Sequence, residues 1–552
     1  MSLTKIKSQK IQVFVAKKII TMNPGQPEAT CVAVREGKIL SVGSLEEVGQ
    51  WGEVEVNHAF QDKILMPGLV EGHCHLMEGA MWDAVYVGYH DRRGPDGKCW
   101  KGLTSLDQVI RRLKQAEAEM TDASTELLAW GFDPIFFGTG RLSAKELDTV
   151  SAIRPIAILH ASVHLMNVNS AMLAVAGIDE DTDIDGIHKD AAGKPSGELQ
   201  EFAAMFPIYR IIGKQLAISS SEKESAIWNF GKVAQLAGVT TATDLMNDLS
   251  AIGAVNLRKI TPDDNYPIRI VPAYGPQRSA ENGLKRLQEA IAKNTDKLHY
   301  GPVKVIVDGS IQGFTARVKW PGYFDGKPNG LWIIPPSQFV ELFTPFHLNG
   351  LQLHVHTNGD EAAELVINAF EEILTKHPRA DHRHTLQHCQ MADTAQLRRI
   401  AALGMCINFF SNHIYYWGDA HYNQTMGPDR ANRMNAAGSA LRLGIPIAFH
   451  SDAPITQLSP LFTAWCAVQR KTSSGRVLGE NERISVSAAL HAITLGAAYT
   501  LKMDHLVGSI EVGKYADFAV LEQDPTQIDP DHLKDISVWG TVLGGKVFES
   551  PK

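Results

Sequence analysis

Residues 66–75 read Met66-Pro-Gly-Leu-Val-Glu-Gly-His-Cys-His75, and the interpretation of the whole chain starts from this stretch. An apolar lead-in enters a Pro-Gly turn, and two histidines separated by one residue follow. Side chains alternate between the two faces of an extended strand, so His73 and His75 point the same way. Two imidazoles on one face can bind a single divalent metal ion. Because such a pair also arises by chance at a strand end, the rest of the chain has to decide between a metal site and two unrelated polar residues.

The composition is that of an ordinary globular protein: of 552 residues, 44% are hydrophobic and 21% are charged. Lys and Arg total 53 against 61 for Asp and Glu, and the formal charge of −8 disfavours nucleic acid as a partner. The 6 cysteines show no C-x-x-C spacing, which suits free thiols in a reducing compartment. No window offers the ~18 apolar residues of a membrane helix, and residues 1–10 lack the apolar core of a signal peptide. We therefore expect a soluble cytoplasmic protein.

The order of strand-like and helix-like segments predicts an α/β fold with three parts. Short β-like runs at the two ends, residues 1–63 and 505–552, predict a small β-sandwich built from both termini. Between them eight strand-like segments alternate with helix-like ones, which predicts a (β/α)8 TIM barrel over residues 64–76 and 230–504. Residues 77–229 form a gap too long for a crossover helix, so we expect a large insertion after strand 1 that caps the barrel mouth.

Polar side chains recur near the ends of the predicted barrel strands, where such barrels place their sites. Strict alternation directs these side chains inwards: Lys304, Asp308, His354, His356, His384, His388, His450 and Asp452. On the sixth strand it puts His384, Leu386 and His388 on one face. A packed barrel interior normally carries branched apolar residues, so this collection indicates a site.

Taken in order, these segments resemble the motifs of the amidohydrolase superfamily, and within it the YtcJ-like group with a large insertion after the first strand. The resemblance runs nearly end to end and rests on residues 67–75, 303–310, 356–360, 383–388, 450–454 and 508–517. It implies a centre with two zinc ions per chain. The residues carried over to the first ion are His73, His75 and Asp452, and those carried over to the second are His356 and His388.

The resemblance further implies that Lys304 bridges the two ions as a carboxylated lysine, formed by reaction with carbon dioxide. That reaction needs a neutral amine, and burial inside a barrel lowers the pKa of a lysine. An unmodified Lys304 that pairs with Asp452 or Asp308 is the alternative.

The activity implied is hydrolysis of a C–N bond other than a peptide bond, by water activated at the metal. Asp452 would accept the proton of that water and pass it to the leaving nitrogen. Two other functions stay open. A mononuclear deaminase on the same barrel usually has a catalytic glutamate where this chain has Gly359, and an inactive relative would serve as a binding or regulatory protein. A homodimer also stays open.

The chain departs from the family pattern at positions that leave the substrate in doubt. Gln387 replaces a glutamate, Glu71 an aspartate and His450 a glycine, and Asn408 stands where relatives often have glutamine. Cys74 is expected to face away from the metal. The residues predicted to contact the small-molecule substrate are His413, His450, Asn408 and Trp130. For the two histidines the alternative is an ordinary hydrogen-bonded place in the core, and for Trp130 it is a place in the core of the cap.

Overall fold

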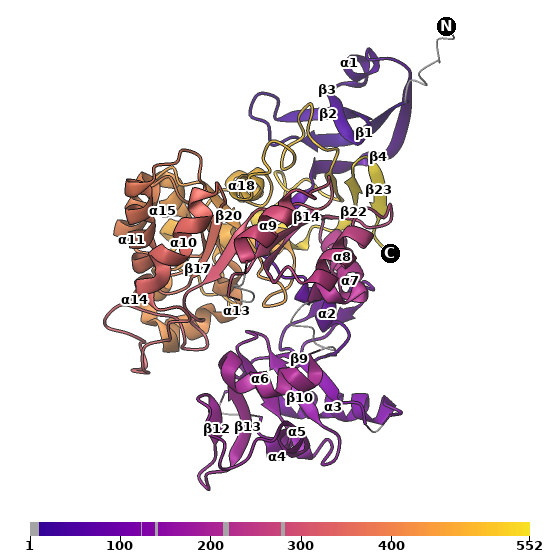
Figure 1. Ribbon diagram of the computed structural model, residues 1–552. Helices are drawn as coiled ribbons and strands as arrows, with labels where there is room; N and C mark the ends of the chain where they lie inside the picture. Colours follow the sequence, from indigo (N-terminus) through magenta and orange to yellow (C-terminus); the bar gives the residue numbers. More distant parts are fainter. Residues whose placement is uncertain (1–9, 123, 139–141, 214–219, 278–281, 552) are drawn as a thin grey trace.

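The computed structural model describes residues 10–122, 124–138, 142–213, 220–277 and 282–551. Residues 1–9, where the sequence predicts no signal peptide, lie outside the described part. Figure 1 shows three parts, with the terminal sheet at the top, the barrel in the middle and the cap at the bottom. Among the described residues, no helix has both the length and the apolar character needed to cross a bilayer.

Strands from both ends of the described chain pair in one seven-stranded sheet, in the order β23-β22-β21-β4-β1-β2-β3. Its strands are β1 (Ile11–Ile20), β2 (Glu28–Arg35), β3 (Lys38–Gly43), β4 (Val54–Pro67), β21 (Phe518–Leu521), β22 (Val538–Leu543) and β23 (Lys546–Glu549), and α1 (Leu45–Gly49) follows β3. β4 pairs with β1, and its final residues 64–67 pair with β21. The expected boundary at residue 64 therefore falls inside β4, and the chain leaves this sheet only at Gly68.

The next sheet consists of eight parallel strands in the described residues, in the order β20-β19-β18-β17-β16-β15-β14-β5, which confirms the (β/α)8 barrel. The strands are β5 (Leu69–Glu71), β14 (Val239–Asn247), β15 (Arg269–Tyr274), β16 (Val303–Ile306), β17 (Leu353–Thr357), β18 (Thr385–His388), β19 (Cys406–Phe409) and β20 (Ile447–Phe449). Just beyond β5 and β20, the His75 N–H donates to Ala453 O (2.8 Å) and the Asp452 N–H donates to His73 O (3.0 Å). Candidate metal ligands thus join the two edge strands.

Helices pack around the barrel sheet (Figure 1). They include α7 (Glu224–Leu236), α8 (Ala251–Ile260), α9 (Gly283–Ile291), α10 (Phe339–Leu348), α11 (Asp360–Lys376), α12 (Thr394–Ala402), α15 (Ala437–Arg442), α16 (Pro460–Gln469), α17 (Val486–Ala492) and α18 (Leu495–Thr500). Val303 and Val305 of β16 are fully buried in the apolar core, which also holds Phe339 and Phe343 of α10, whereas Lys304 between them contacts His73. Alternation on this strand therefore separates the apolar core from the polar interior.

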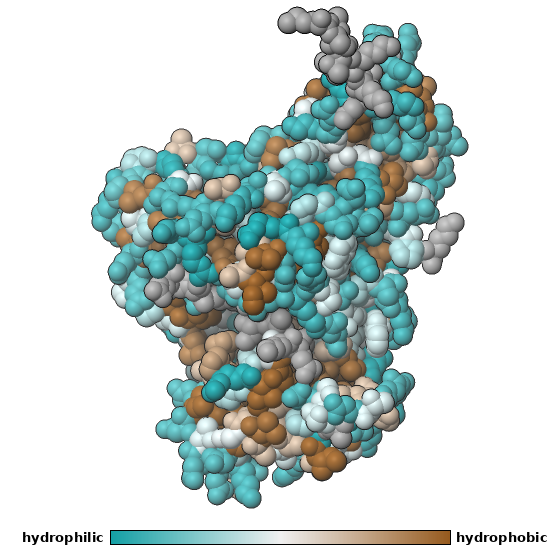
Figure 2. Space-filling view, turned by 45° about the vertical axis from the view of Figure 1, so that its right-hand side comes forward, coloured by the Kyte–Doolittle hydropathy of each residue, from teal (hydrophilic) through white to brown (hydrophobic). Residues whose placement is uncertain are grey.

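The insertion forms a cap with its own described sheet, in the order β12-β13-β11-β10-β9-β6. Its elements are α2 (Met77–Met81), β6 (Val85–Tyr86), β7 (Arg92–Arg93), β8 (Cys99–Trp100), α3 (Leu106–Glu119), β9 (Leu127–Phe132), α4 (Ala144–Asp148), β10 (Ile156–His160), β11 (Leu165–Val168), α5 (Ser170–Ala176), β12 (Ile187–Lys189), β13 (Pro195–Gln200) and α6 (Glu201–Ile212). Figure 1 places β9 and α6 on the side of the cap nearest the barrel, and Figure 2 shows apolar surface on the cap lobe.

Polar contacts of Asp133 and Arg92 attach the cap to the barrel. Trp417 of α13 (Asn412–Ala420) donates through Nε1 to Asp133 Oδ2 at 2.9 Å. Arg92 donates to the carbonyl oxygen of Pro454 at 2.7 Å and pairs with Glu78 at 2.6 Å. The cap is therefore fixed to the segments that follow β19 and β20.

A buried ion pair joins the barrel to the terminal sheet. Arg269 on β15 is 1% exposed, and it donates to Asp517 from Nε (2.7 Å) and from Nη2 (3.0 Å). Asp517 also accepts the N–H of Gly544 through its carboxylate and the N–H of Gly68 through its carbonyl oxygen. The motif at residues 508–517 thus ends in a structural aspartate.

Replacement of Asp517 by alanine should lower the free energy of unfolding by about 3–5 kcal/mol, because it leaves a buried guanidinium without its counter-ion. Guanidinium denaturation followed by tryptophan fluorescence measures this loss. Arg433→Ala is the control, since it removes an exposed pair with Asp429 and should cost about 0.5 kcal/mol or less. Equal midpoints for Asp517→Ala and the wild type would refute this role.

Candidate metal centre

The carboxyl ends of the barrel strands bring the predicted ligands together. His73 and His75 follow β5, and Asp452 follows β20. Asp452 Oδ1 lies 3.1 Å from the Nε2 atoms of both histidines, and Lys304 Nζ lies 3.1 Å from His73 Nε2. With zinc–nitrogen distances of about 2.0–2.1 Å, two donors on one tetrahedral ion are roughly 3.3 Å apart. These side chains are therefore spaced as ligands of a metal ion are.

His388 and His356 face each other on neighbouring strands, with 2.9 Å between His388 Nε2 and His356 Nδ1. His356 Nε2 lies 3.1 Å from both Gly309 O and Asn358 Nδ2. His388 Nδ1 is buried and has no hydrogen-bond partner in the described part of the chain. Within the described residues, donor atoms that a single ion could join form two groups: His73 with His75 and Asp452, and His73 with His388 and His450.

Burial sets the charge state of the donors. It lowers the pKa of Lys304 to about 7, so that much of this amine is neutral near pH 7. Burial also lowers the pKa values of His73, His356 and His388 well below the ordinary value for histidine. Neutral imidazoles offer the lone pairs that a metal ion requires.

Gln387 orients His73. Its Oε1 lies 2.8 Å from His73 Nδ1, and its Nε2 lies 2.7 Å from His354 Nδ1. His73 therefore donates from Nδ1 and presents its Nε2 lone pair towards Lys304 and Asp452. A metal-binding histidine usually has such an acceptor behind it. The departure from glutamate at this position thus retains the orienting hydrogen bond without a negative charge.

Two of the candidate ligands have left-handed backbone conformations, with φ of 66° at His388 and 52° at Asp452. Residues other than glycine seldom adopt this region, and such strain concentrates at functional sites. The conformation also breaks the alternation of β18. Leu386 belongs to the apolar core and His384 stacks on a ring of α11, while Gln387 faces the interior. The predicted grouping of His384, Leu386 and His388 on one inward face is therefore wrong.

Asp308 organises the loop that follows β17, whereas the sequence analysis predicted for it only a possible ion pair with Lys304. Its buried carboxylate accepts the backbone N–H groups of Asn358 (3.0 Å), Gly359 (2.9 Å) and Arg317 (3.1 Å). Burial raises its pKa to about 7. The feature of the sequence that could have indicated this role is a single aspartate just after a buried strand.

Glu71 plays a similar part between the two edge strands. Its carboxylate accepts the backbone N–H of Ser451 at 3.0 Å and the hydroxyl of Ser451 at 3.1 Å. Burial raises its pKa to about 8. It therefore fixes the segment that carries Asp452, and its longer side chain spans from β5 to that segment. Cys74 is buried and contacts Thr243 O at 3.1 Å, away from the donor atoms.

The cap contributes an imidazole–carboxylate pair that the sequence did not reveal. His164 Nδ1 lies 3.0 Å from Glu201 Oε2, and the Glu201 N–H donates to His164 O at 2.8 Å. The backbone φ is positive at Val163 (55°), which precedes His164, and at Glu201 itself (63°). Although burial lowers it, the pKa of His164 is raised on balance by Glu201 and by the more distant charges of Asp452 and Asp308. His164 thus lies within electrostatic reach of the centre.

The four residues predicted to contact substrate have different surroundings. His450 and Asn408 are 0% exposed inside the barrel, and the ring of His450 stacks 4.4 Å from that of His73. His413 on α13 lies beside the centre, with its Nδ1 at 3.1 Å from His421 Nε2. Trp130, on β9, is packed in the core of the cap.

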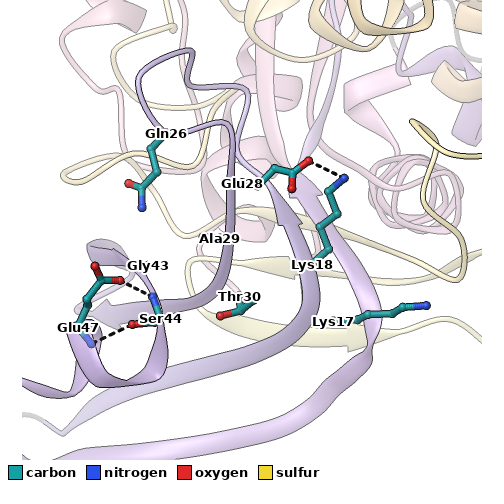
Figure 3. A pocket seen from close by; sticks show the side chains of 9 residues that line it. All are labelled: Lys17, Lys18, Gln26, Glu28, Ala29, Thr30, Gly43, Ser44 and Glu47. Atoms are coloured by element: carbon teal, nitrogen blue, oxygen red, sulfur yellow. Dashed lines mark hydrogen bonds and ion pairs between the residues drawn. The ribbon is translucent and has the colours of Figure 1, made fainter.

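The terminal sheet has a hollow on its surface (Figure 3). Its charged and polar groups bond to one another: Lys18 pairs with Glu28 at 2.7 Å, and Ser44 and Glu47 form a capping box at the start of α1. Paired groups of this kind indicate surface structure rather than a ligand site.

Comparisons with known proteins agree with a metal centre in this fold. A family model described as "Amidohydrolase family" matches residues 61–548. The chain is 28% identical to YtcJ of Bacillus subtilis (strain 168) over 547 residues, covering 96% of this chain and 97% of that protein. It is 25% identical to N-substituted formamide deformylase of Arthrobacter pascens over 544 residues, covering 94% of each. An uncharacterized metal-dependent hydrolase from Pyrococcus horikoshii has the same fold, with a TM-score of 0.73 at 19% identity over 95% of this chain and 99% of that one.

Gln387→Ala should weaken metal binding by about 10–100-fold, because His73 loses the acceptor that holds its tautomer and orientation. Gln387→Glu keeps an acceptor at the same place and should bind metal nearly as the wild type does. Competition with a chelator of known affinity measures the difference. Unchanged affinity in the alanine variant would show that Gln387 does not support the centre.

Proposed function

The chain belongs to the amidohydrolase family, and from this premise we propose that it hydrolyses a C–N bond other than a peptide bond in a small molecule. The observation that carries the proposal is the contact of Asp452 with His73 and His75 at 3.1 Å, beside the buried Lys304. The likeness to a formamide deformylase over 94% of the chain supports an acyl–nitrogen substrate such as an N-substituted formamide.

The donor set fits divalent metal, and we assign two zinc ions to it. Imidazole and carboxylate donors suit zinc, and the unpartnered Nδ1 of His388 among the described residues offers a lone pair. The ligands proposed for the first ion are His73, His75 and Asp452, and those for the second are His356 and His388. Bound there, such ions would lower the pKa of water and polarise the substrate carbonyl.

Lys304 would supply the bridge between the two ions. Its neutral Nζ would attack the carbon of carbon dioxide, form an N–C bond and release one proton, which leaves a carbamate with two oxygen donors. The amine is 1% exposed, and burial lowers its pKa to about 7. Its Nζ lies 3.1 Å from His73 Nε2, which supports a role beside the first ion.

Asp452 is the residue proposed for proton transfer. Its side chain is partly open to the barrel mouth, and the bond from its N–H to His73 O fixes its backbone. It would take a proton from the attacking water and deliver it to the leaving nitrogen. His164, held by Glu201, would provide the cap with a hydrogen-bond donor to the substrate.

The two alternatives are less well supported. The deaminase needs a glutamate where Gly359 stands, and a Cβ built there would meet Arg317 O at 1.7 Å, so no larger side chain fits. The regulatory alternative draws on a 24% identical relative from Pectobacterium carotovorum, named "Exoenzymes regulatory protein AepA", which covers 79% of this chain. The close spacing of His73, His75 and Asp452 favours catalysis in this chain.

Metal-reconstituted protein should release formate or a carboxylic acid from a library of N-substituted formamides and other N-acyl amines. Asp452→Asn should lower kcat by about 10²–10⁴-fold, because it removes the proton acceptor. Asp429→Asn, at a highly exposed aspartate, serves as the control. Activity that survives Asp452→Asn would overturn the assignment.

Carbamate on Lys304 should give a ¹³C signal after incubation with labelled bicarbonate, and Lys304→Arg should lack it. Since burial lowers the pKa of the amine to about 7, the neutral form dominates above that pH and the protonated form below it. The signal should therefore grow between pH 6 and pH 8. A spectrum of the wild type that matches that of Lys304→Arg would exclude the bridge.

A further inference from the structure

His450 is a buried imidazole whose ring nitrogens both lack hydrogen-bond partners among the described residues. It is 0% exposed. Burial of a polar nitrogen without a partner costs free energy, and native structures generally avoid it. Histidines at the opposite end of the strands, in contrast, have hydrogen-bond partners. His384 bonds to His347 at 2.9 Å, and His347 Nε2 donates to His377 O at 2.8 Å. Both ring nitrogens of His450 are therefore available to a ligand.

The rings of His73, His388 and His450 form a close cluster. Their centroids are 4.7 Å (His73 to His388), 4.4 Å (His73 to His450) and 5.0 Å (His388 to His450) apart. With a zinc–nitrogen bond of about 2.0–2.1 Å, the centroids of two imidazoles on one tetrahedral ion are roughly 5.2 Å apart. The separation of His388 and His450, whose rings are inclined by 63°, approaches this value. One nitrogen from each ring lies within 4.8 Å of the others.

The ring of His450 is also fixed in position. Phe410 stacks on it at 4.8 Å with an interplanar angle of 29°, and the ring of His73 lies 4.4 Å away at 25°. Both faces are therefore covered by aromatic rings, and its nitrogens at the ring edge remain for a ligand.

We propose that His450 is itself a metal ligand, a further imidazole donor beside His388 for the second ion of the proposed function. The proposal rests on the metal centre of the proposed function and adds a donor where the family pattern has glycine. A nitrogen-rich site of this kind selects zinc, cobalt, nickel or iron over magnesium, calcium or manganese.

The test compares His450→Phe with His384→Phe after loading with Co²⁺. Phenylalanine at 450 keeps a ring between Phe410 and His73 but offers no donor. His384, at the opposite end of the strands, likewise stacks on a phenylalanine, Phe370, at 4.7 Å, and among the described residues it belongs to neither donor group. We expect His450→Phe to lose one ion per chain or to bind it about 100-fold more weakly, with a changed visible cobalt spectrum, whereas His384→Phe keeps the wild-type stoichiometry and spectrum.

A second variant separates loss of the ligand from misfolding. His450→Gly restores the residue of the family pattern and leaves room for free imidazole, which should recover metal affinity and the wild-type cobalt spectrum. Wild-type stoichiometry, affinity and spectrum in His450→Phe would overturn the proposal and leave the proposed function intact. A wild-type protein that retains no metal would instead overturn the metal centre of the proposed function.

Discussion

Burial of nitrogen donors inside the barrel is the constraint on which the rest of the structure depends. His73, Lys304 and His388 are 1–2% exposed, and burial disfavours the charged form of each. The centre is consequently a set of neutral lone pairs gathered around the carboxylate of Asp452. Such a set has few hydrogen-bond partners of its own, which suits it to the binding of a divalent cation.

The fold supplies this centre through the bonds that close the barrel. The Asp452 N–H donates to His73 O, so the same backbone bond joins the two edge strands of the barrel and positions two candidate ligands. Glu71 holds the neighbouring Ser451 through two hydrogen bonds. On the other side, Arg269 and Asp517 join the barrel to the terminal sheet. The centre therefore rests on contacts between segments that are far apart in sequence, and removal of any one of them loosens a ligand-bearing segment.

Strand periodicity made the barrel and the region of its site predictable, because the side chains of parallel strands alternate and their carboxyl ends meet at one rim. Periodicity failed where the backbone leaves the extended region. Simple alternation places His388 on the same face as Leu386. The left-handed φ of His388 turns its ring away from that face. The pairing of His164 with Glu201 was also out of reach, since no local pattern brings together two residues on separate segments of the cap. The sequence pattern showed Gln387 only as a departure, whereas the hydrogen bond to His73 explains it.

The cap and the centre are parts of one packed unit. Asp133 of the cap accepts a hydrogen bond from Trp417, whose ring lies 4.4 Å from that of His413. His413 contacts Phe410 at 4.6 Å, and Phe410 stacks on His450 at 4.8 Å. Close-packed rings of this kind have no free volume into which one member can shift alone. The packing of the cap therefore bears on the position of His450, through the row of rings formed by Trp417, His413, Phe410 and His450.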